Sequence, residues 1–291
     1  MANRRAGPKL TTLAEAARLV RAGDVLGVGG MMLYRKPMAL VREIARTGVG
    51  NLTLLTFTAS IEAELLALAG ALRTIRACYM GLEFLGLAPA LRRAIEKGTV
   101  KVVEETEYTI VYGLQAALMS VPYLPARDCE VGTDYFKIRP DLKRARCPVT
   151  TEMLTWFPAI APRIAVIHVP MADAHGNAWL GGQHGIDAQL AMAAEVVIVT
   201  AERIVATEQI RDAQGGAGLV SFMVDAVVEA LGGAHPTSCH PDYPTDVVHI
   251  ARYLKSSRAK GADRYLETFI AGAPTLPEYL ARVREDHHAG G

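Results

Sequence analysis

The chain has 291 residues, 51% of them hydrophobic, which is enough to bury a sizeable core in one large α/β domain or two small ones. Its 31 basic and 30 acidic residues leave a net charge of +1, so nothing in the overall charge favours binding to nucleic acid or to an acidic membrane surface. The four cysteines are far apart and form no C-x-x-C pair, which argues against a zinc ribbon or a disulfide scaffold.

The N-terminal segment MANRRAGPKL is basic, but no apolar signal-peptide core follows it. No apolar run approaches the roughly 18 residues that a membrane span needs. We therefore expect a cytoplasmic protein that binds neither membranes nor nucleic acid.

The first predicted elements are a helix, a strand and a second helix. Thr12 and Glu15 have the spacing of a capping box, and apolar residues follow at helical period until Gly23 ends the helix. The segment DVLGVGG has the pattern of a buried strand. Pro37 opens the next helix at its first position, and Gly48 closes it.

Strands and helices then alternate along most of the chain. The expected strands cover residues 24–30, 52–57, 74–80, 100–105, 163–173, 196–202 and 219–230. The expected helices cover residues 12–23, 37–48, 60–70, 88–98, 109–120, 186–195 and 205–213. This alternation predicts an α/β fold with an open, mostly parallel sheet and helices on both faces.

Two regions depart from this alternation. Between residues 122 and 162, prolines punctuate short segments without clear periodicity, and such a stretch in a compact domain is more often functional than idle. From about residue 246 only helical patterns remain, and residues 286–291 read as a frayed tail. We expect a single domain over residues 1–291 with a C-terminal helical cap.

Ligands in open parallel sheets gather beyond the carboxyl ends of the strands, so the segment after the first strand is a candidate site. A dinucleotide fingerprint and a phosphate-binding loop are both absent from GGMMLYRKP. Gly29 and Gly30 would instead let a thioester or carboxyl oxygen approach backbone N–H groups, with Arg35 or Lys36 for CoA phosphates or a substrate carboxylate. The alternative is a tight strand-to-helix turn with no such role.

Two further segments follow strands at the same predicted edge. CYMGLEF places Gly81 and Glu83 there, and EETEYT offers several carboxylates that otherwise read as a solvated strand end. Glu107 stands out because a helix starts near it, and the field of a helix N-terminus favours an ionised, nucleophilic carboxylate.

The histidine-containing loops point less clearly to chemistry. ADAHGNAWLGGQHG could bring metal ligands together but is also a good turn sequence, and we expect no metal. GGAHPTSCHPDY carries Cys239 and His240, which could suggest a nucleophile pair or a structural loop near the site. The chain therefore has the rim of a site without a complete catalytic set.

An ordered set of segments resembles a known family. GGMMLYRKPMALVREIAR, VYGLQAALMSVPYLPAR, ADAHGNAWLGG, AAEVVIVTAERIVATEQI and MVDAVVEALGGAHPTSC together resemble the α subunit of family I coenzyme A transferases, nearest the glutaconate CoA-transferase type. The match runs from Thr12 to about Tyr243. It implies the CoA-transferase-like fold, a homologous β subunit that pairs with this chain, and an acyl-CoA and a carboxylic acid as substrates, without a permanently bound cofactor.

The resemblance also implies a reaction. In the two-chain members the β subunit carries the nucleophilic glutamate, which forms an acyl-glutamyl anhydride and then a glutamyl-CoA thioester. The α subunit then supplies the turn at Gly29 and Gly30 as a wall of the acyl pocket. The family commonly has an aromatic residue after these glycines, whereas this chain has Met31, which leaves the preferred acyl group open.

A second branch of the family is similar in CYMGLEF and in EETEYT…PYLPAR. These are α subunits of hydrolases that open a ring in CoA-linked steroid fragments, and there a glutamate matching Glu107 serves the chemistry, with Arg127 matching a nearby functional arginine. A third hypothesis is a ligand-binding module, since sugar-phosphate isomerases and effector-sensing domains of regulators share the general fold.

Overall fold

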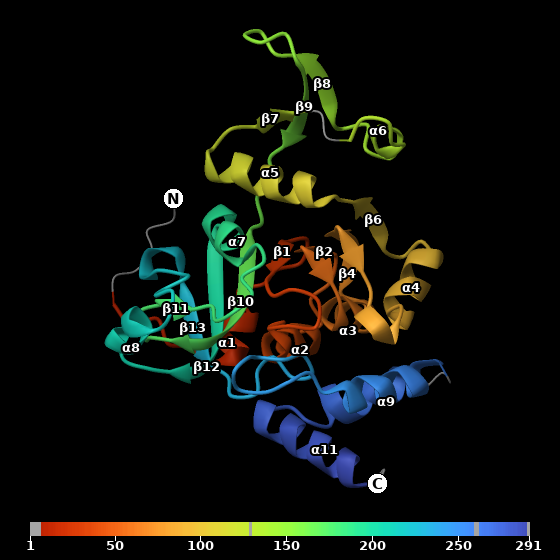
Figure 1. Ribbon diagram of the computed structural model, residues 1–291. Coiled ribbons are helices and arrows are strands. Elements are labelled where there is room, and N and C mark those ends of the chain that lie inside the picture. Colours follow the sequence, from red (N-terminus) through yellow and green to blue (C-terminus); the bar gives the residue numbers. More distant parts are fainter. Residues whose placement is uncertain (1–6, 128–129, 259–261, 290–291) are drawn as a thin grey trace.

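The computed structural model describes residues 7–127, 130–258 and 262–289. Its centre is an eight-stranded sheet in the order β13-β12-β10-β1-β2-β4-β6, with β11 beside β10 (Figure 1). All of its pairings are parallel except that of β11. The strands are β1 (Val25–Val28), β2 (Leu52–Thr56), β4 (Leu72–Ala77), β6 (Lys101–Glu104), β10 (Ile164–Ala172), β11 (Ala178–Trp179), β12 (Val196–Ile204) and β13 (Ala226–Glu229). The predicted α/β class is confirmed.

Helices cover both faces of the sheet, because its central strands are apolar on both sides. One core packs α1 (Leu13–Ala17), α2 (Met38–Arg46), α3 (Ile61–Leu68) and α4 (Pro89–Glu96) against one face. The helix α9 (Val247–Arg258) joins this core beside α4. A second core places α5 (Glu107–Leu118) and α7 (Asp187–Ala193) on the other face. The short helix α8 (Thr207–Asp212) follows β12.

Several element boundaries differ from the sequence-based expectation. The capping box of Thr12 and Glu15 is present, but α1 ends at Ala17. Pro37 is the N-cap of α2 rather than its first residue. The expected strand 219–230 is a short 3₁₀ turn, η2 (Ser221–Met223), followed by β13.

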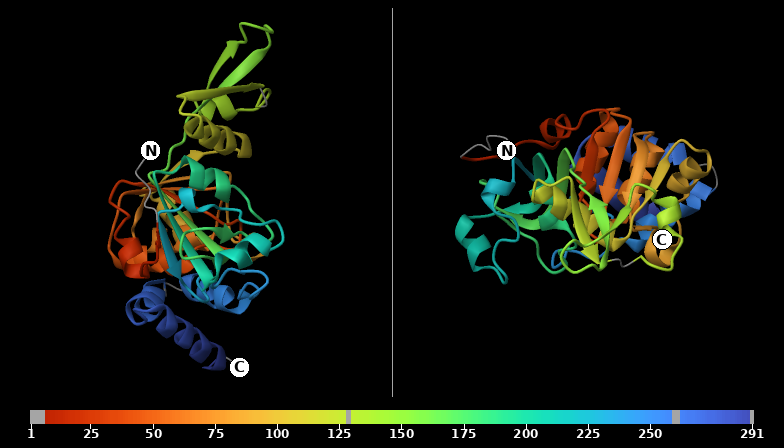
Figure 2. Two further views of the ribbon diagram at one scale, coloured as in Figure 1. Left: turned by 90° about the vertical axis from the view of Figure 1, so that its left-hand side faces the viewer. Right: turned by 90° about the horizontal axis from the view of Figure 1, so that it is seen from above.

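Residues 122–162 form a small antiparallel sheet that projects from the main body (Figure 2). Its order is β7-β9-β8, from β7 (Tyr123–Arg127), β8 (Lys143–Arg146) and β9 (Met153–Pro158), with the short helix α6 (Tyr135–Ile138) beside it. The expectation of an irregular stretch is therefore wrong. Tyr135, Leu142 and Phe157 give this sheet a core of its own.

The C-terminal cap contains α9, α10 (Ala262–Leu266), the π-helix η3 (Glu267–Ala271) and α11 (Leu276–Ala289). It lies at the opposite end of the molecule from α5 and the projecting sheet (Figures 1 and 2). Residues 286–289 of the predicted frayed tail are the last residues of α11, so the fraying stays a prediction, and residues 290–291 lie outside the described ranges. None of the helices in those ranges has the length and apolar character needed to traverse a bilayer.

Candidate active site

The loop after β1, residues 29–37, is the point at which several segments beyond the carboxyl ends of the strands meet. The Met32 N–H donates to Thr58 Oγ1 at 2.6 Å, from the segment after β2. The Leu33 N–H donates to Glu83 Oε1 at 3.0 Å, from the segment after β4 and the two-residue strand β5 (Tyr79–Met80). The predicted convergence of these segments at one sheet edge is therefore present.

Gly29 and Gly30 form a buried turn at the centre of this loop. The Gly29 N–H donates to Val166 O at 2.9 Å, and the Gly30 N–H donates to Asp187 Oδ1 at 2.8 Å. Both donors are thus engaged within the chain, and both residues are buried. The expectation that their N–H groups face an acyl oxygen does not fit this geometry, because a donor used inside the fold has no hydrogen left to offer.

Arg35 is completely buried and lies beneath the turn. Its guanidinium pairs with Asp187 Oδ2 at 2.9 Å and also donates to His168 O at 2.7 Å and to Gln183 O at 2.5 Å. Since Asp187 also accepts the Gly30 N–H, one carboxylate holds both the turn and the cation. The suggestion that Arg35 binds CoA phosphates is not compatible with this burial.

Lys36 is also completely buried, on the other side of the loop. Its ammonium pairs with Glu62 Oε1 at 2.9 Å and donates to Thr56 Oγ1 at 3.0 Å and to Thr58 O at 2.7 Å. It therefore ties the loop to the end of β2. The buried Lys36 ammonium, like the buried Arg35 guanidinium, is not accessible to a CoA phosphate, and both cations shape the loop from inside.

Sequence reasoning missed the partner carboxylates of these two cations. Asp187 is the first residue of α7, and Glu62 lies in the first turn of α3; both are fully buried. Both residues are acidic and lie in otherwise apolar helical segments. Because a buried carboxylate needs a partner, this pattern could have indicated that each one pairs with a buried cation.

Gly81 lies at the same edge but contributes backbone rather than a binding group. Its N–H donates to Ala59 O at 3.0 Å, and an added Cβ would lie only 2.6 Å from Tyr79 Oη. A side chain at this position would displace the Tyr79 ring. The structure thus gives Gly81 a packing role, and its predicted substrate contact stays a prediction.

Glu107 is exposed and is the first residue of α5, so it lies in the field of the helix N-terminus as predicted. Thr106 caps the helix by accepting from the Thr109 N–H at 3.2 Å. Burial and then the charge of Glu107 raise the pKa of the Cys78 thiol to about 11. Cys78 directly follows β4, so the charge of Glu107 acts on a residue of the candidate edge.

The buried Glu105 lies two residues before α5 and forms two ion pairs. Its carboxylate pairs with Arg76 at 2.5 Å and with Arg139 at 2.6 Å, so it is neutralised by two guanidinium groups. Of the clustered carboxylates predicted after β6, Glu105 is structural, whereas Glu104 and Glu107 are exposed.

Arg127 lies on β7 of the projecting sheet, and its side chain is 87% exposed. It forms a 3.7 Å ion pair with Glu152, which is also largely exposed. Among the described residues, no ion pair or hydrogen bond joins Arg127 to Glu107, so their predicted cooperation stays a prediction.

His168, Glu202 and Cys239 form a buried cluster whose nitrogen, oxygen and sulfur atoms lie within 4.8 Å of one another. His168 Nε2 lies 2.7 Å from Glu202 Oε1, while Glu202 also accepts from the Gly232 N–H at 2.6 Å. Burial raises the pKa of the Cys239 thiol well above its usual range. Cys239 is also fully buried, which does not fit the reactive nucleophile suggested for its loop.

The loop ADAHGNAWLGGQHG, whose sequence suits either a metal site or a turn, is a hydrogen-bonded turn at Asp173. Asp173 Oδ1 accepts from the N–H groups of His175 and Asn177, both at 2.9 Å. Asp173 Oδ2 accepts from Thr207 Oγ1 at 2.7 Å. The D-x-H-G-N sequence therefore closes a turn next to α8, with the aspartate as its acceptor.

The sequence and the fold are similar to those of named enzyme subunits. The family model described as "Coenzyme A transferase" matches residues 10–230. The chain is 30% identical to the A-subunit of the 3-oxoadipate CoA-transferase of Pseudomonas knackmussii over 95% of this chain and 99% of that protein. It is 33% identical to the cholesterol ring-cleaving hydrolase IpdA subunit of Mycobacterium tuberculosis over 94% of this chain and 97% of that protein.

The crystal structure of glutaconate coenzyme A-transferase from Acidaminococcus fermentans superposes with a TM-score of 0.87 at 27% identity, covering 94% of this chain and 92% of that chain. An uncharacterised protein of Archaeoglobus fulgidus is 38% identical over 94% of this chain. The chain spans only 62% of the length of that archaeal protein.

Proposed function

The chain belongs to the coenzyme A transferase family, and we propose that it is the α-type subunit of a heteromeric enzyme that moves CoA from an acyl-CoA to a carboxylic acid. The observation that carries this proposal is the similarity to the A-subunits of two CoA-transferases along nearly their whole lengths. Because these relatives are named as single subunits of larger enzymes, they support a second, β-type chain as the partner. The acyl-CoA is a substrate of the complex rather than a resident cofactor.

In this proposal a glutamate on the partner chain attacks the thioester carbonyl. The C–S bond breaks, CoA leaves as a thiolate, and the acyl group and the glutamate form an anhydride. The thiolate then attacks the glutamyl carbonyl and releases the first acid, which leaves a glutamyl-CoA thioester. An acceptor carboxylate attacks this thioester, the C–S bond breaks, and CoA leaves again as a thiolate from a mixed anhydride of the acceptor and the glutamate. The thiolate then attacks the acceptor carbonyl of the anhydride, which forms the new acyl-CoA and releases the glutamate carboxylate.

This chain supplies the wall against which the acyl group lies. Loop 29–37 suits that role because two buried ion pairs and bonds from its N–H groups fix its shape. Met31 and Met32 are half-buried at its surface, and the Met31 sulfur lies 3.0 Å from Gln183 Nε2. These flexible apolar side chains suit an acyl chain of adaptable shape.

A second candidate function is a hydrolase subunit that opens a CoA-linked cyclic diketone. The observation that favours it is the exposed Glu107 carboxylate at the start of α5, together with the similarity to the ring-cleaving hydrolase subunit. Glu107 would take a proton from water as the oxygen attacks a ring carbonyl. The adjacent C–C bond would then break to give a carboxylate, and the carbanion would take up a proton.

The two candidates are separated by comparing Glu107→Gln with Glu104→Gln, a neighbouring exposed carboxylate, in the complex of this chain with its co-purified partner. For a transferase, both variants should retain CoA transfer within a few-fold, and borohydride should trap a glutamyl-CoA adduct on the partner chain. For the hydrolase, Glu107→Gln alone should abolish cleavage of a cyclic-diketone CoA thioester. Absence of both activities from the wild-type complex would contradict both and favour the ligand-binding module.

A further inference from the structure

The C-terminal cap contains a cavity of about 460 Å³ that is separate from the candidate active site. Its lining comes entirely from α9, α10, η3 and α11, outside the residues matched by the family model. This volume lies within the roughly 300–1,000 Å³ range of small-molecule sites. A ligand bound there is at the end of the molecule opposite α5, so it cannot touch Glu107 (Figure 1).

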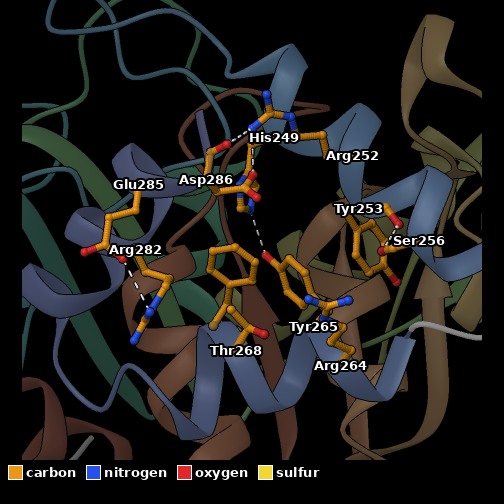
Figure 3. Close-up of a pocket in the computed structure, with 11 residues that line it drawn as sticks. His249, Arg252, Tyr253, Ser256, Arg264, Tyr265, Thr268, Arg282, Glu285 and Asp286 are labelled. Atoms are coloured by element: carbon orange, nitrogen blue, oxygen red, sulfur yellow. Dashed lines mark hydrogen bonds and ion pairs between the residues drawn. The ribbon is translucent and has the colours of Figure 1, made fainter. Parts of the chain in front are cut away.

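One wall of the cavity is aromatic (Figure 3). The Tyr265 ring lies 4.9 Å from that of Phe269 and 4.8 Å from that of Tyr253, measured between centroids. Planar apolar groups pack well against such ring faces and edges. The wall therefore favours a ligand with an aromatic or otherwise planar body.

Within the described part of the chain, two of the three arginines that line the cavity are in ion pairs. Arg252 pairs with Asp286 at 2.9 Å, and Arg282 pairs with Glu285 at 3.3 Å (Figure 3). Arg264 is exposed at the cavity and has no ion pair among the residues that the structure describes. A single unpaired guanidinium suits one carboxylate, which it can bind through two parallel hydrogen bonds.

The cavity lining also includes the buried side chain of His249. His249 is only 2% exposed, and its Nε2 lies 3.1 Å from Tyr265 Oη (Figure 3). Within the described ranges, its other ring nitrogen, Nδ1, has no hydrogen-bond partner. Buried polar atoms are seldom left in this state, and His249 is one of the residues that line the cavity, so its ring is a contact point for a second polar group of a ligand.

We propose that this cavity binds a hydroxyaryl carboxylate, with the carboxylate on Arg264, the ring against Tyr265 and Phe269, and the hydroxyl toward His249. Arg264 and Tyr265 lie on α10, Phe269 lies on η3 and His249 lies on α9. The ligand would therefore join α9 to α10 and η3. This site is additional to the proposed acyl-CoA site and does not depend on the transferase assignment.

The test is calorimetric titration of the intact protein, with its partner if the two co-purify, using 4-hydroxybenzoate as the probe. Benzoate lacks the hydroxyl and 4-hydroxybenzamide lacks the charge, and each should bind about tenfold more weakly. Arg264→Gln should weaken 4-hydroxybenzoate about tenfold, and Arg264→Lys, which keeps the charge but not the two parallel hydrogen bonds, should weaken it by less than Arg264→Gln does. Arg284→Gln, which removes an exposed α11 arginine outside the cavity lining, should change nothing.

Arg264 is exposed, so its substitution should leave the melting temperature unchanged, and loss of binding can be assigned to the site. Equal affinities for all three probes would overturn the proposal, as would undiminished binding by Arg264→Gln. Failure of 4-hydroxybenzoate to bind at millimolar concentration would also overturn it.

Discussion

Gly30 has a backbone φ of +75°, a region that glycine occupies easily and other residues do not. A Cβ built there would lie 2.6 Å from both Tyr34 O and Arg35 O. These carbonyls belong to the same loop and cannot move without disturbing it. The residue therefore sets the shape of loop 29–37 even though its N–H is bonded to Asp187.

We expect Gly30→Ala to lower the free energy of unfolding by several kcal/mol, since backbone strain and a clash with two carbonyls add together. Gly48→Ala is the matched control, because its φ is +69° and nothing lies within 4 Å of the added Cβ. It should cost about 1 kcal/mol. Urea denaturation measures both, and equal losses would contradict the clash.

Asp187→Asn tests the buried ion pair beneath the turn. The asparagine carbonyl can still accept the Gly30 N–H, but Arg35 is left as an uncompensated charge in the core, at a cost of about 3–5 kcal/mol. Asp212→Asn removes an exposed pair with Arg211 and should cost less than about 0.5 kcal/mol. Comparable denaturation midpoints for the two variants would show that Asp187 does not stabilise the turn.

For single residues, the sequence predicted the position of loop 29–37 but not that Arg35 and Lys36 form buried ion pairs. Glu107 was predictable because helix starts are encoded locally, by Thr106 and the pattern that follows. The pairing of Arg35 with Asp187 joins residues separated by 152 positions, so no local pattern contains it. Whether a cation beside glycines faces a ligand or the core depends on such distant partners.

Among the elements, the parallel sheet was predictable and the projecting sheet was not. Strands such as β10 are almost continuously buried and stand out as apolar runs. By contrast, β8 reads KRAR and is mostly exposed, and β7 contains Pro125. Such short edge strands depend on pairing with β9, so their own sequences carry little strand signal.

The free energy of unfolding should fall as the pH falls, because of His249, a residue of α9 that packs against Tyr279 of α11. Burial, followed by the positive charges of His235 and Arg42, lowers the pKa of His249 from its ordinary value of 6.5 to about 3, although Asp246 and Asp286 act in the opposite direction. The folded state then binds fewer protons than the unfolded state between these two values. The contribution of His249 to the free energy of unfolding is therefore fully present above pH 6.5. It falls by about 1.4 kcal/mol per pH unit as the pH drops from 6.5 towards 3.

Urea unfolding at pH 7 and pH 5 should show this loss, about 2 kcal/mol from His249. His249→Gln removes the titrating group and should flatten the dependence by that amount. His288→Gln, which removes an exposed histidine of α11, should leave it unchanged. Identical pH dependence in wild type and His249→Gln would argue against a buried neutral imidazole.

For the whole molecule, the proposed partner implies an uncovered apolar surface next to the candidate site. Phe84 is 75% exposed and Leu87 is 58% exposed, both close to the loop after β4 that contacts loop 29–37. Large apolar side chains grouped in this way favour association. Without its partner, the chain should self-associate and lack CoA-transfer activity.

Light scattering after size exclusion measures this association. Joint replacement of Phe84 and Leu87 by serine should shift the isolated chain toward monomer and weaken partner binding, without lowering the melting temperature. Phe222→Ser, at a residue 68% exposed elsewhere, should affect neither. A monomeric, fully active wild-type chain would contradict the two-subunit proposal.

The pairing of β1 with β10 also has a consequence for how the chain is made. On the ribosome, β1, β2, β4 and β6 emerge first and can assemble among themselves. The β1 partner for Leu26 is Ile164, which emerges only after the projecting sheet has been translated. During that interval the nascent sheet presents an apolar open edge, which is the kind of surface that chaperones cover and that drives aggregation when synthesis stalls.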